Sequence, residues 1–140
     1  MNQRQIFKQL LKRDKLLVAP GCFDGLSARL VEEAGFEAAY LSGGAVARSM
    51  GLPDIGLVTM SEVIERAAQV AAAVKIPVIA DADTGYGNAI NLVRAVREFE
   101  RTGVAAIHVE DQVTPKRCGH LEGKEVVAPA EMEKKIEAAL

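Results

Sequence analysis

Apolar positions recur along the chain in two alternating patterns. Short apolar runs, bounded by glycine, proline or acidic residues, alternate with longer segments whose apolar side chains return every three or four positions. The short runs predict strands at 15–20, 36–44, 76–85 and 104–112. The longer segments predict helices at 2–14, 24–35, 61–75, 88–103 and 129–140. Apolar strands alternating with helices are typical of a parallel sheet covered by helices, so the sequence predicts an α/β fold.

Several of the predicted helices carry recognisable end signals. Asn88 is expected to cap its helix and Gly103 to stop it, while Thr59 or Ser61 is expected to cap the helix before the third strand. Residues 42–59, which contain several glycines and a proline, are predicted to form a long loop. Loops of this length are uncommon in compact domains and are often functional.

Residues with distinctive chemistry gather where the predicted strands end. They are Gly21, Cys22, Ser42, Gly43, Gly44, Asp81, Asp83, Glu110 and Asp111. A (β/α)₈ barrel binds its substrates at this end of its strands, and so does an open doubly wound sheet. The segment after the first strand, PGCFDGLSA, does not match the glycine-rich phosphate loop of such open sheets, which favours the barrel. A complete barrel needs roughly 250 residues. Four strand–helix units therefore predict an N-terminal half-barrel, one partial domain over residues 1–140.

Composition narrows the function classes. The chain has 140 residues, of which 49% are hydrophobic, so a packed core is expected. A formal net charge of −2 argues against general binding to nucleic acid. No apolar run approaches the roughly 20 residues of a membrane span, and the N-terminus lacks the apolar core of a signal peptide. We therefore expect a cytoplasmic protein without nucleic-acid or membrane partners, whose Cys22 and Cys118 are free thiols.

Three carboxylates are predicted to meet at the strand ends. Asp81 and Asp83 are two residues apart and so share one face, and Glu110 ends the next strand. Carboxylates at close range repel one another unless a cation lies between them, and oxygen ligands suit a hard divalent ion such as Mg²⁺. The sequence therefore favours a metal site. The alternative is a pair of aspartates that only cap turns.

The second strand is followed by groups suited to an anionic ligand. Ser42, Gly43 and Gly44 combine a hydroxyl with backbone N–H groups that can approach an anion closely, although SGG is also common in flexible loops. Tyr40 is a candidate to point its hydroxyl into the barrel mouth. Asp54, in the long loop, is either a turn residue or a gating carboxylate.

A cysteine lies among cations in the stretch TPKRCGH. Cys118 is next to Arg117 and within two residues of Lys116 and His120, and such neighbours favour a reactive thiol. Zinc is disfavoured because no second cysteine stands at ligand spacing. His108, which shares the face of Glu110, is expected to be a satisfied polar core residue.

Four segments together resemble a known superfamily. YLSGGAVARSMGLPDIG, DADTGYGN, HVEDQ and PKRCGHLEGKEVV resemble the isocitrate lyase/phosphoenolpyruvate mutase superfamily, over roughly residues 15–135 and closest to its 2-methylisocitrate lyase and 2,3-dimethylmalate lyase branch. The resemblance implies a (β/α)₈ barrel, a Mg²⁺ or Mn²⁺ ion and a homo-oligomer, which is a tetramer in full-length members. It implies cleavage of a carbon–carbon bond in a 2-hydroxy di- or tricarboxylate. The products would be pyruvate or glyoxylate and a second carboxylate such as succinate.

The resemblance also implies roles for the acidic residues and their neighbours. Asp83 would be the direct metal ligand, with Asp81 and Glu110 holding the metal's waters. Tyr40 and Asp54 would lie beside the metal-bound substrate. The base that takes the substrate's hydroxyl proton is not identified by this resemblance.

The remaining candidates receive roles in binding and proton transfer. The 2-oxo acid carboxylate would be bound by Ser42, Gly43 and Gly44. Cys118 would be the general acid on a mobile loop. The carboxylates of the second fragment would be attracted by its three cationic neighbours, Lys116, Arg117 and His120.

The sequence departs from the family in one large respect, because no fifth to eighth strand is present. We therefore expect little or no turnover from a monomer of these 140 residues. Two rival interpretations stay open. The acidic site could serve a phosphonate mutase, a phosphonate hydrolase or an oxaloacetate decarboxylase, in which Cys118 is dispensable. The other interpretation is non-enzymatic: a half-barrel that binds a carboxylate, pairs with a second copy, or is an inactive fragment.

Overall fold

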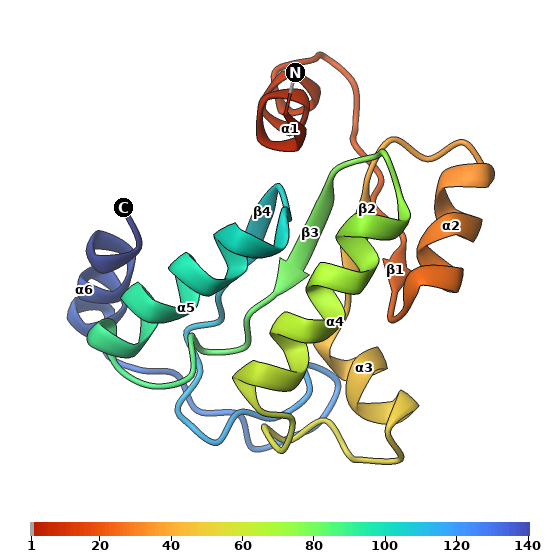
Figure 1. The fold of residues 1–140 in the computed structure, drawn as a ribbon. Coiled ribbons are helices and arrows are strands. Elements are labelled where there is room, and N and C mark those ends of the chain that lie inside the picture. Colours follow the sequence, from red (N-terminus) through yellow and green to blue (C-terminus); the bar gives the residue numbers. More distant parts are fainter. Residues whose placement is uncertain (1) are drawn as a thin grey trace.

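The structure, a computed structural model, describes residues 2–140. Helices and strands alternate along this part of the chain after an initial helix (Figure 1). The elements are α1 (Gln3–Leu11), β1 (Gly21–Cys22), α2 (Gly25–Glu33), β2 (Ala39–Leu41), α3 (Gly43–Ser49), α4 (Met60–Ala73), β3 (Val78–Asp81), α5 (Ala89–Thr102), β4 (Ala106–His108) and α6 (Pro129–Ala139).

The four strands form one parallel sheet in the order β1-β2-β3-β4. Strands that follow one another in sequence are therefore neighbours in space, and each connection passes through at least one helix. Tyr40 is in register with Gly21 on one side and Ile79 on the other, and Asp81 is in register with His108. All four strands consequently end at the same edge, where the loops gather at the bottom of Figure 1.

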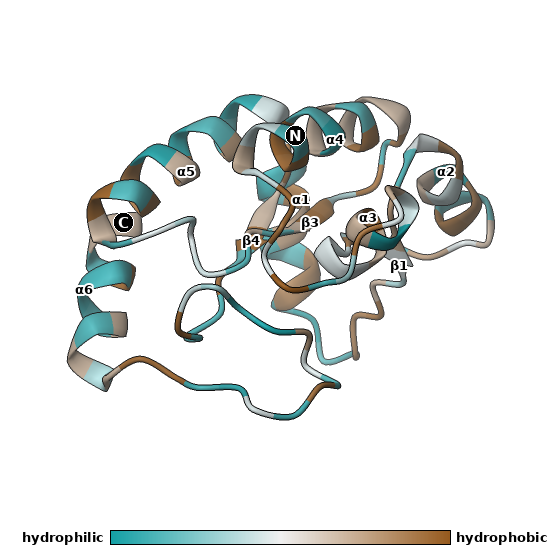
Figure 2. Ribbon diagram, turned by 90° about the horizontal axis from the view of Figure 1, so that it is seen from below, coloured by the Kyte–Doolittle hydropathy of each residue, from teal (hydrophilic) through white to brown (hydrophobic). Residues whose placement is uncertain are grey.

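Helices line one side of this sheet. Figure 2 shows α2, α4 and α5 as an arc along that side, with α6 beside α5, while loops cross the other side. Their apolar faces meet the strands in a core of fully buried side chains, of which the largest in one cluster are Phe99, Leu41, Val46 and Val70. This arrangement matches the predicted α/β class. It leaves the strand ends free to carry polar groups.

Helix ends follow the sequence signals closely. Thr59, rather than Ser61, caps α4 in a reciprocal pairing with Glu62. Asn88 caps α5, and Gly103 ends it with a left-handed φ of 88°. These predictions are confirmed. At Thr59 and Asn88 a side-chain oxygen accepts from amides of the first helical turn that have no partner within the helix. At Gly103 the missing side chain permits the left-handed conformation that ends α5.

Two predicted elements differ from the structure. The run 15–20 is not a strand, since Leu16 and Val18 are 83% and 50% exposed and sheet pairing begins only at Pro20, whose carbonyl accepts from the Tyr40 N–H. The segment 42–59, predicted as loop, contains the helix α3. Ser42 caps this helix, and Gly51, with a φ of 75°, follows its end.

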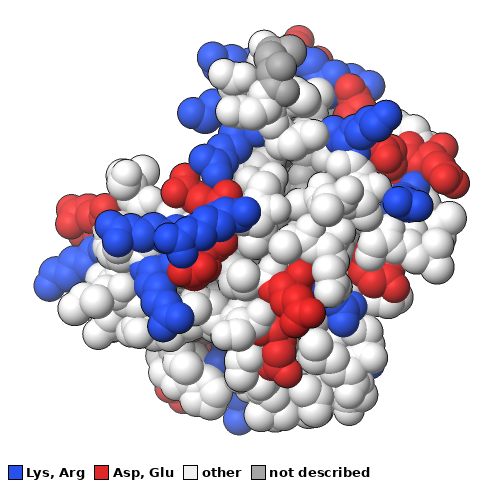
Figure 3. All heavy atoms as spheres, viewed as in Figure 1, with Lys and Arg blue, Asp and Glu red and all other residues white. Residues whose placement is uncertain are grey.

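Surface charge is mixed. Lysine and arginine side chains alternate with acidic ones over the face shown in Figure 3. Among residues 2–140, none of the helices combines the length and the apolar character needed to cross a membrane.

Candidate active site

A buried lysine joins two aspartates at the carboxyl ends of the strands. Lys116, from the loop after β4, lies with its Nζ 2.7 Å from Asp54 Oδ1 and 2.9 Å from Asp83 Oδ1. The three side chains are only 4%, 10% and 14% exposed. Burial alone lowers the pKa of Lys116, but its bonds to the two carboxylates outweigh burial and raise that pKa. The ammonium is therefore charged and acts as a cation between two carboxylates.

Asp81 lies at the centre of this group. Its Oδ1 accepts from the Asp83 N–H at 3.0 Å, and its Oδ2 accepts from the Gly43 N–H at 3.2 Å. A Cβ at Gly43 would lie 2.9 Å from Asp81 Oδ2, and a Cβ at Gly44 would lie 2.6 Å from Asp54 Oδ2. The two glycines are thus explained by the close approach of two carboxylates to α3.

The acidic turn that follows β3 has an unusual backbone. Asp83 and Tyr86 have φ angles of 46° and 61°, in the left-handed region that non-glycine residues seldom adopt. Neighbouring segments hold this turn in place: the Glu110 N–H donates to the Asp83 carbonyl at 2.7 Å, and the buried Lys135 of α6 donates to the Thr84 carbonyl at 3.1 Å. The turn conformation that presents Asp83 is therefore fixed from two sides.

Gln112 links Glu110 to the loop that carries Lys116. Its Nε2 donates to Glu110 Oε2 at 3.0 Å and to the Arg117 carbonyl at 2.9 Å, while its Oε1 accepts from the Arg117 N–H at 3.0 Å. Only 7% of Gln112 is exposed. Gln112 was not among the site residues predicted from the sequence, although a glutamine two positions after a strand-end glutamate was a usable signal.

The cation beside Cys118 comes from α3 and not from the adjacent sequence. Arg48 Nη2 lies 3.7 Å from Cys118 Sγ, and the Cys118 N–H donates to the Asp54 carbonyl at 3.0 Å. Lys116 faces the aspartates instead, and the Arg117 guanidinium reaches the Glu122 carbonyl at 3.4 Å. His120 is exposed. Arg48 was missed because its helix was predicted as loop.

Tyr40 of β2 and His108 of β4 form a pair across the intervening strand β3. The Tyr40 hydroxyl and His108 Nδ1 are 2.9 Å apart. Burial raises the pKa of Tyr40, and the negative charges of Asp81 and Glu110 raise it further, so the phenol keeps its proton. The expectation that His108 is a core residue is wrong: its side chain is exposed, because β4 is the edge strand. Cys22 is fully buried as expected, and burial raises its pKa to about 11.

The carboxylates raise one another's proton affinity. Burial raises the pKa of Asp83, and Lys116 opposes this while Asp81 and Asp54 add to it. Burial also raises the pKa of Glu110, again opposed by Lys116 and reinforced by Asp81 and Asp83. A group of acids in this state is stabilised by any additional cation.

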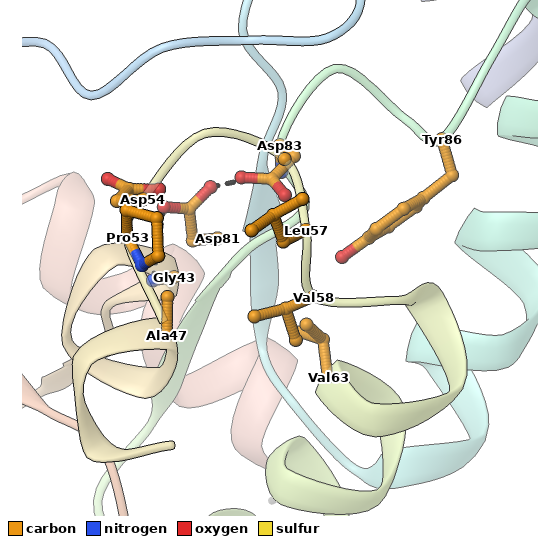
Figure 4. A pocket seen from close by; sticks show the side chains of 11 residues that line it. Gly43, Ala47, Pro53, Asp54, Leu57, Val58, Val63, Asp81, Asp83 and Tyr86 are labelled. Carbon is orange, nitrogen blue, oxygen red and sulfur yellow. Dashed lines mark hydrogen bonds between the residues drawn. The ribbon is translucent and has the colours of Figure 1, made fainter. Parts of the chain in front are cut away.

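The donor chemistry of this group fits a hard divalent ion, whereas its present arrangement does not form a complete cage. Carboxylate oxygens are the ligands that Mg²⁺ and Mn²⁺ prefer. Asp54, Asp81 and Asp83 face a cavity of about 10 Å³, to which Tyr86 contributes from the opposite wall (Figure 4). The buried hydroxyl of Tyr86 has no hydrogen-bond partner. Within residues 2–140 no three acidic, histidine or cysteine side chains are placed to share one metal ion. Asp81 and Asp83 are together, but Glu110 does not complete a cluster with them.

Curated proteins similar to this chain include two lyases. The chain is 49% identical over 141 residues to a 2,3-dimethylmalate lyase from Eubacterium barkeri, covering 100% of the chain and 49% of that lyase. It is 50% identical over 135 residues to a 2-methylisocitrate lyase from Aeropyrum pernix, covering 96% of the chain and 44% of the lyase. The chain thus spans about half the length of the curated relatives it matches.

Solved structures give the same result. A 2,3-dimethylmalate lyase described as a PEP mutase/isocitrate lyase superfamily member superposes with a TM-score of 0.93 at 42% identity, over 99% of this chain and 47% of that one. A phosphonopyruvate hydrolase in complex with oxalate and Mg²⁺ superposes with a TM-score of 0.91 at 36% identity, over 99% and 47% of the two chains. Residues 7–140 also match the phosphoenolpyruvate phosphomutase family. The chain therefore belongs to that family, and its four strand–helix units correspond to the N-terminal half of the (β/α)₈ barrel of the isocitrate lyase/phosphoenolpyruvate mutase superfamily.

Proposed function

We propose that the protein is a metal-dependent carbon–carbon lyase that cleaves a 2-hydroxy di- or tricarboxylate. The substrate would resemble 2-methylisocitrate or 2,3-dimethylmalate, and the products would be pyruvate and a second carboxylate such as succinate. The observation that carries the proposal is a thiol held beside the acidic cluster. Cys118 is fixed to Asp54 by its backbone, while Asp54 shares Lys116 with Asp83. A proton donor and a group of anionic oxygen ligands are thereby brought to one place.

Asp83 is proposed to bind Mg²⁺ or Mn²⁺ directly, and Asp81 and Glu110 are proposed to hold the waters of the ion. When bound, the ion would stabilise the negative charge that develops on the 2-oxygen and carboxylate of the 2-oxo acid fragment. The raised pKa values of Asp83 and Glu110 support this assignment, because both groups gain from a nearby cation. The Mg²⁺ and oxalate in the related phosphonopyruvate hydrolase are consistent with it.

Cys118 is the proposed general acid. A base takes the proton of the substrate hydroxyl, and an electron pair of that oxygen forms the carbonyl of the 2-oxo acid. The bond between the hydroxyl-bearing carbon and its neighbour breaks, and its electron pair remains on the carbon of the second fragment. The Cys118 S–H then donates its proton to this carbon and becomes a thiolate. Arg48, whose Nη2 lies 3.7 Å from Sγ, is placed to stabilise that thiolate.

Tyr40 and the residues at the start of α3 are proposed to bind the 2-oxo acid fragment. The Tyr40 phenol stays protonated, so it can donate to a substrate oxygen. The Gly43 N–H already donates to Asp81, whereas Ser42 uses only its oxygen to cap α3 and keeps its O–H for a ligand. Ser42 therefore has the donor best placed for the substrate carboxylate in this stretch.

Pyruvate release tests this proposal directly. The protein, in its oligomeric form, is incubated with Mg²⁺ and either 2-methylisocitrate or 2,3-dimethylmalate, and pyruvate is followed with lactate dehydrogenase and NADH. We expect Mg²⁺-dependent release that falls at least about 100-fold in Cys118→Ser, since general acid catalysis contributes about that factor or more. A Cys22→Ser variant, altered at the other cysteine, is the matched control. Release that survives in Cys118→Ser at the wild-type rate contradicts the proposed acid.

A second candidate function is hydrolysis or decarboxylation of a short 2-oxo acid. The likeness to the phosphonopyruvate hydrolase favours it, because that protein binds oxalate and Mg²⁺ without being a lyase by name. Phosphonopyruvate and oxaloacetate are therefore included as substrates in the same assay. Activity on either that is unchanged in Cys118→Ser, with none on the hydroxy acids, favours this second function.

The protein is further proposed to be cytoplasmic and to form a homo-oligomer. β1 and β4 are edge strands, and an open parallel edge readily pairs with other chains or segments. We expect a homo-oligomer in analytical ultracentrifugation at micromolar concentrations. A single sedimenting species with the mass of one chain contradicts this part.

A further inference from the structure

Lys116 stands where a cation of the acidic cluster is expected. Its ammonium is within 2.9 Å of both Asp54 Oδ1 and Asp83 Oδ1 and is 4% exposed. Asp83 is the carboxylate proposed as the direct metal ligand. A lysine and a divalent ion at this carboxylate would carry charge of the same sign within a few ångströms of each other. Their mutual repulsion is strong where water is largely excluded.

The small volume of the cavity beside the acidic cluster also indicates that Lys116 and a hydrated divalent ion compete. The cavity bordered by Asp54, Asp81 and Asp83 is about 10 Å³, which is about the room that one water molecule needs. A bound Mg²⁺ usually keeps several waters. A hydrated ion therefore requires the cluster to open, and the ammonium is the cation whose withdrawal would also relieve the repulsion.

Lys116 is tied mechanically to the thiol. We define residues 112–119 as the thiol loop; it contains Gln112, Lys116 and Cys118. Its contacts with the rest of the site include the Lys116 ion pairs, the bond from the Cys118 N–H to the Asp54 carbonyl and the bond from Gln112 to Glu110. Arg48 also lies against Cys118 Sγ, and the hydroxyls of Thr114 and Thr84 are 2.9 Å apart. Within the loop, Gln112 binds both backbone groups of Arg117. A displacement of Lys116 is consequently transmitted to Cys118, two residues away.

We propose that Lys116 is the internal counter-ion of the acidic cluster and competes with the divalent ion for Asp83, so that metal binding and the position of the thiol loop are coupled. This inference rests on the proposed metal site and assigns Lys116 a positioning role in place of attraction for the second fragment. Coupling of this kind is reciprocal: an ion that loosens the loop binds more tightly once the loop is released. The lysine would thus release Cys118 only when the metal has arrived.

Metal affinity tests the competition. Mn²⁺ binding to the protein is measured by isothermal titration calorimetry and by the electron paramagnetic resonance signal of free Mn²⁺. Lys116→Met is expected to bind Mn²⁺ about tenfold or more tightly than wild type, because one repelling charge is lost. Lys116→Arg, which keeps the charge, is expected to stay within about threefold. A general loss of structure would weaken binding, so a gain in affinity separates this role from a merely structural one.

A matched control separates charge from loop mobility. Lys124 is on the same long connection and donates to the carbonyls of Gly119 and Leu121, not to a carboxylate. Lys124→Met therefore loosens the connection without removing charge from the cluster, and its Mn²⁺ affinity is expected to match wild type. Equal tightening in Lys124→Met and Lys116→Met overturns the competition.

The loop is followed in the wild-type protein, so the result does not depend on a variant folding. Hydrogen exchange of a peptide covering residues 112–119, read by mass spectrometry, is expected to quicken when Mn²⁺ saturates the protein. Slower or unchanged exchange overturns the coupling. If Mn²⁺ binds wild type and Lys116→Met equally, the inference fails while the metal site stands. If Mn²⁺ binds neither, or binds Asp83→Asn as well as wild type, the proposed metal site itself fails.

Discussion

Two buried lysines flank the acidic turn, and they differ in how their charge is compensated. Lys116 is 4% exposed and binds two carboxylates. Lys135 is 2% exposed and donates to the Thr84 carbonyl, and the ion pairs found among residues 2–140 include none at Lys135. The first lysine belongs to an electrostatic group, so removing it leaves buried anions unpaired. The second lysine, on α6, supports the acidic turn through a hydrogen bond, and removing it leaves no ion-pair partner without its cation.

The largest expected effect comes from removing the first lysine. Lys116→Met is expected to lower the free energy of unfolding by about 3–5 kcal/mol without metal, the usual cost of breaking a buried ion pair. Urea denaturation followed by circular dichroism measures this. Addition of Mn²⁺ is expected to recover most of the loss. A loss below about 1 kcal/mol would mean that the pair behaves like an exposed one.

A smaller loss is expected when the lysine stays but its partner is pushed away. In Gly44→Ala the new Cβ would lie 2.6 Å from Asp54 Oδ2 and 3.1 Å from Arg48 Nη1. Displacement of Asp54 is expected to cost about 1–3 kcal/mol of unfolding free energy, although alanine favours the helix itself. Gly21→Ala is the control, because no atom lies within 4 Å of its Cβ position. Wild-type stability in Gly44→Ala would show that Asp54 is not held in place by Lys116.

Lowering the pH should partly remove the loss of unfolding free energy that Lys116→Met causes. Burial raises the pKa of Asp83, and Lys116 is the strongest influence that opposes this rise. Without Lys116 the folded state holds the Asp83 proton more tightly than the unfolded chain does. That difference costs stability above the unfolded pKa, and the cost disappears as pH falls through the folded pKa. The deficit relative to wild type should therefore shrink as pH is lowered from neutral toward the pKa of an unfolded aspartate, about 3.9. A constant deficit across this range would exclude Asp83 as its source.

The smallest effect is expected at the second lysine. Lys135→Met keeps most of the length of the side chain and removes a buried charge together with one hydrogen bond. These changes oppose each other, so the free energy of unfolding should move by no more than about 1 kcal/mol. Lys134→Met, at an exposed neighbour on α6, is the control. A loss above about 3 kcal/mol would show that the Thr84 contact is essential to the turn and that the two lysines are not different in kind.

Local signals predicted the fold well where one segment determines its own conformation. The caps at Thr59 and Asn88 and the helix stop at Gly103 depend on neighbours within a few residues. Asn88 and Gly103 were predicted from sequence, and Thr59 was one of two candidates, the other being Ser61. The run 15–20 failed because a strand needs a partner, and pairing starts at Pro20. The helix α3 was missed because its paired glycines and the proline beyond it suggested a loop. Ser42 followed by Ala45, Val46 and Ala47 was the overlooked capping signal.

The residues of the site could be predicted from the sequence more readily than the contacts between their side chains. Asp81 and Asp83 share a strand end, so their proximity follows from spacing alone. The partner of Lys116 could not be found in this way, because Asp54 lies two strands earlier in the sequence. For the same reason the cation beside Cys118 was sought among its sequence neighbours, whereas Arg48 reaches it from another helix. Side-chain direction across loops is a tertiary property, which residue spacing does not determine.

The order of the strands has a consequence for how the chain folds as it is synthesised. Each strand pairs with the one made just before it, so every new unit can dock on those already in place without waiting for distant sequence. Asp54 and Asp83 leave the ribosome long before Lys116 does. A nascent chain would therefore carry its buried acids uncompensated until the loop after β4 emerges, and a free divalent ion in the cell could stabilise this stage of synthesis.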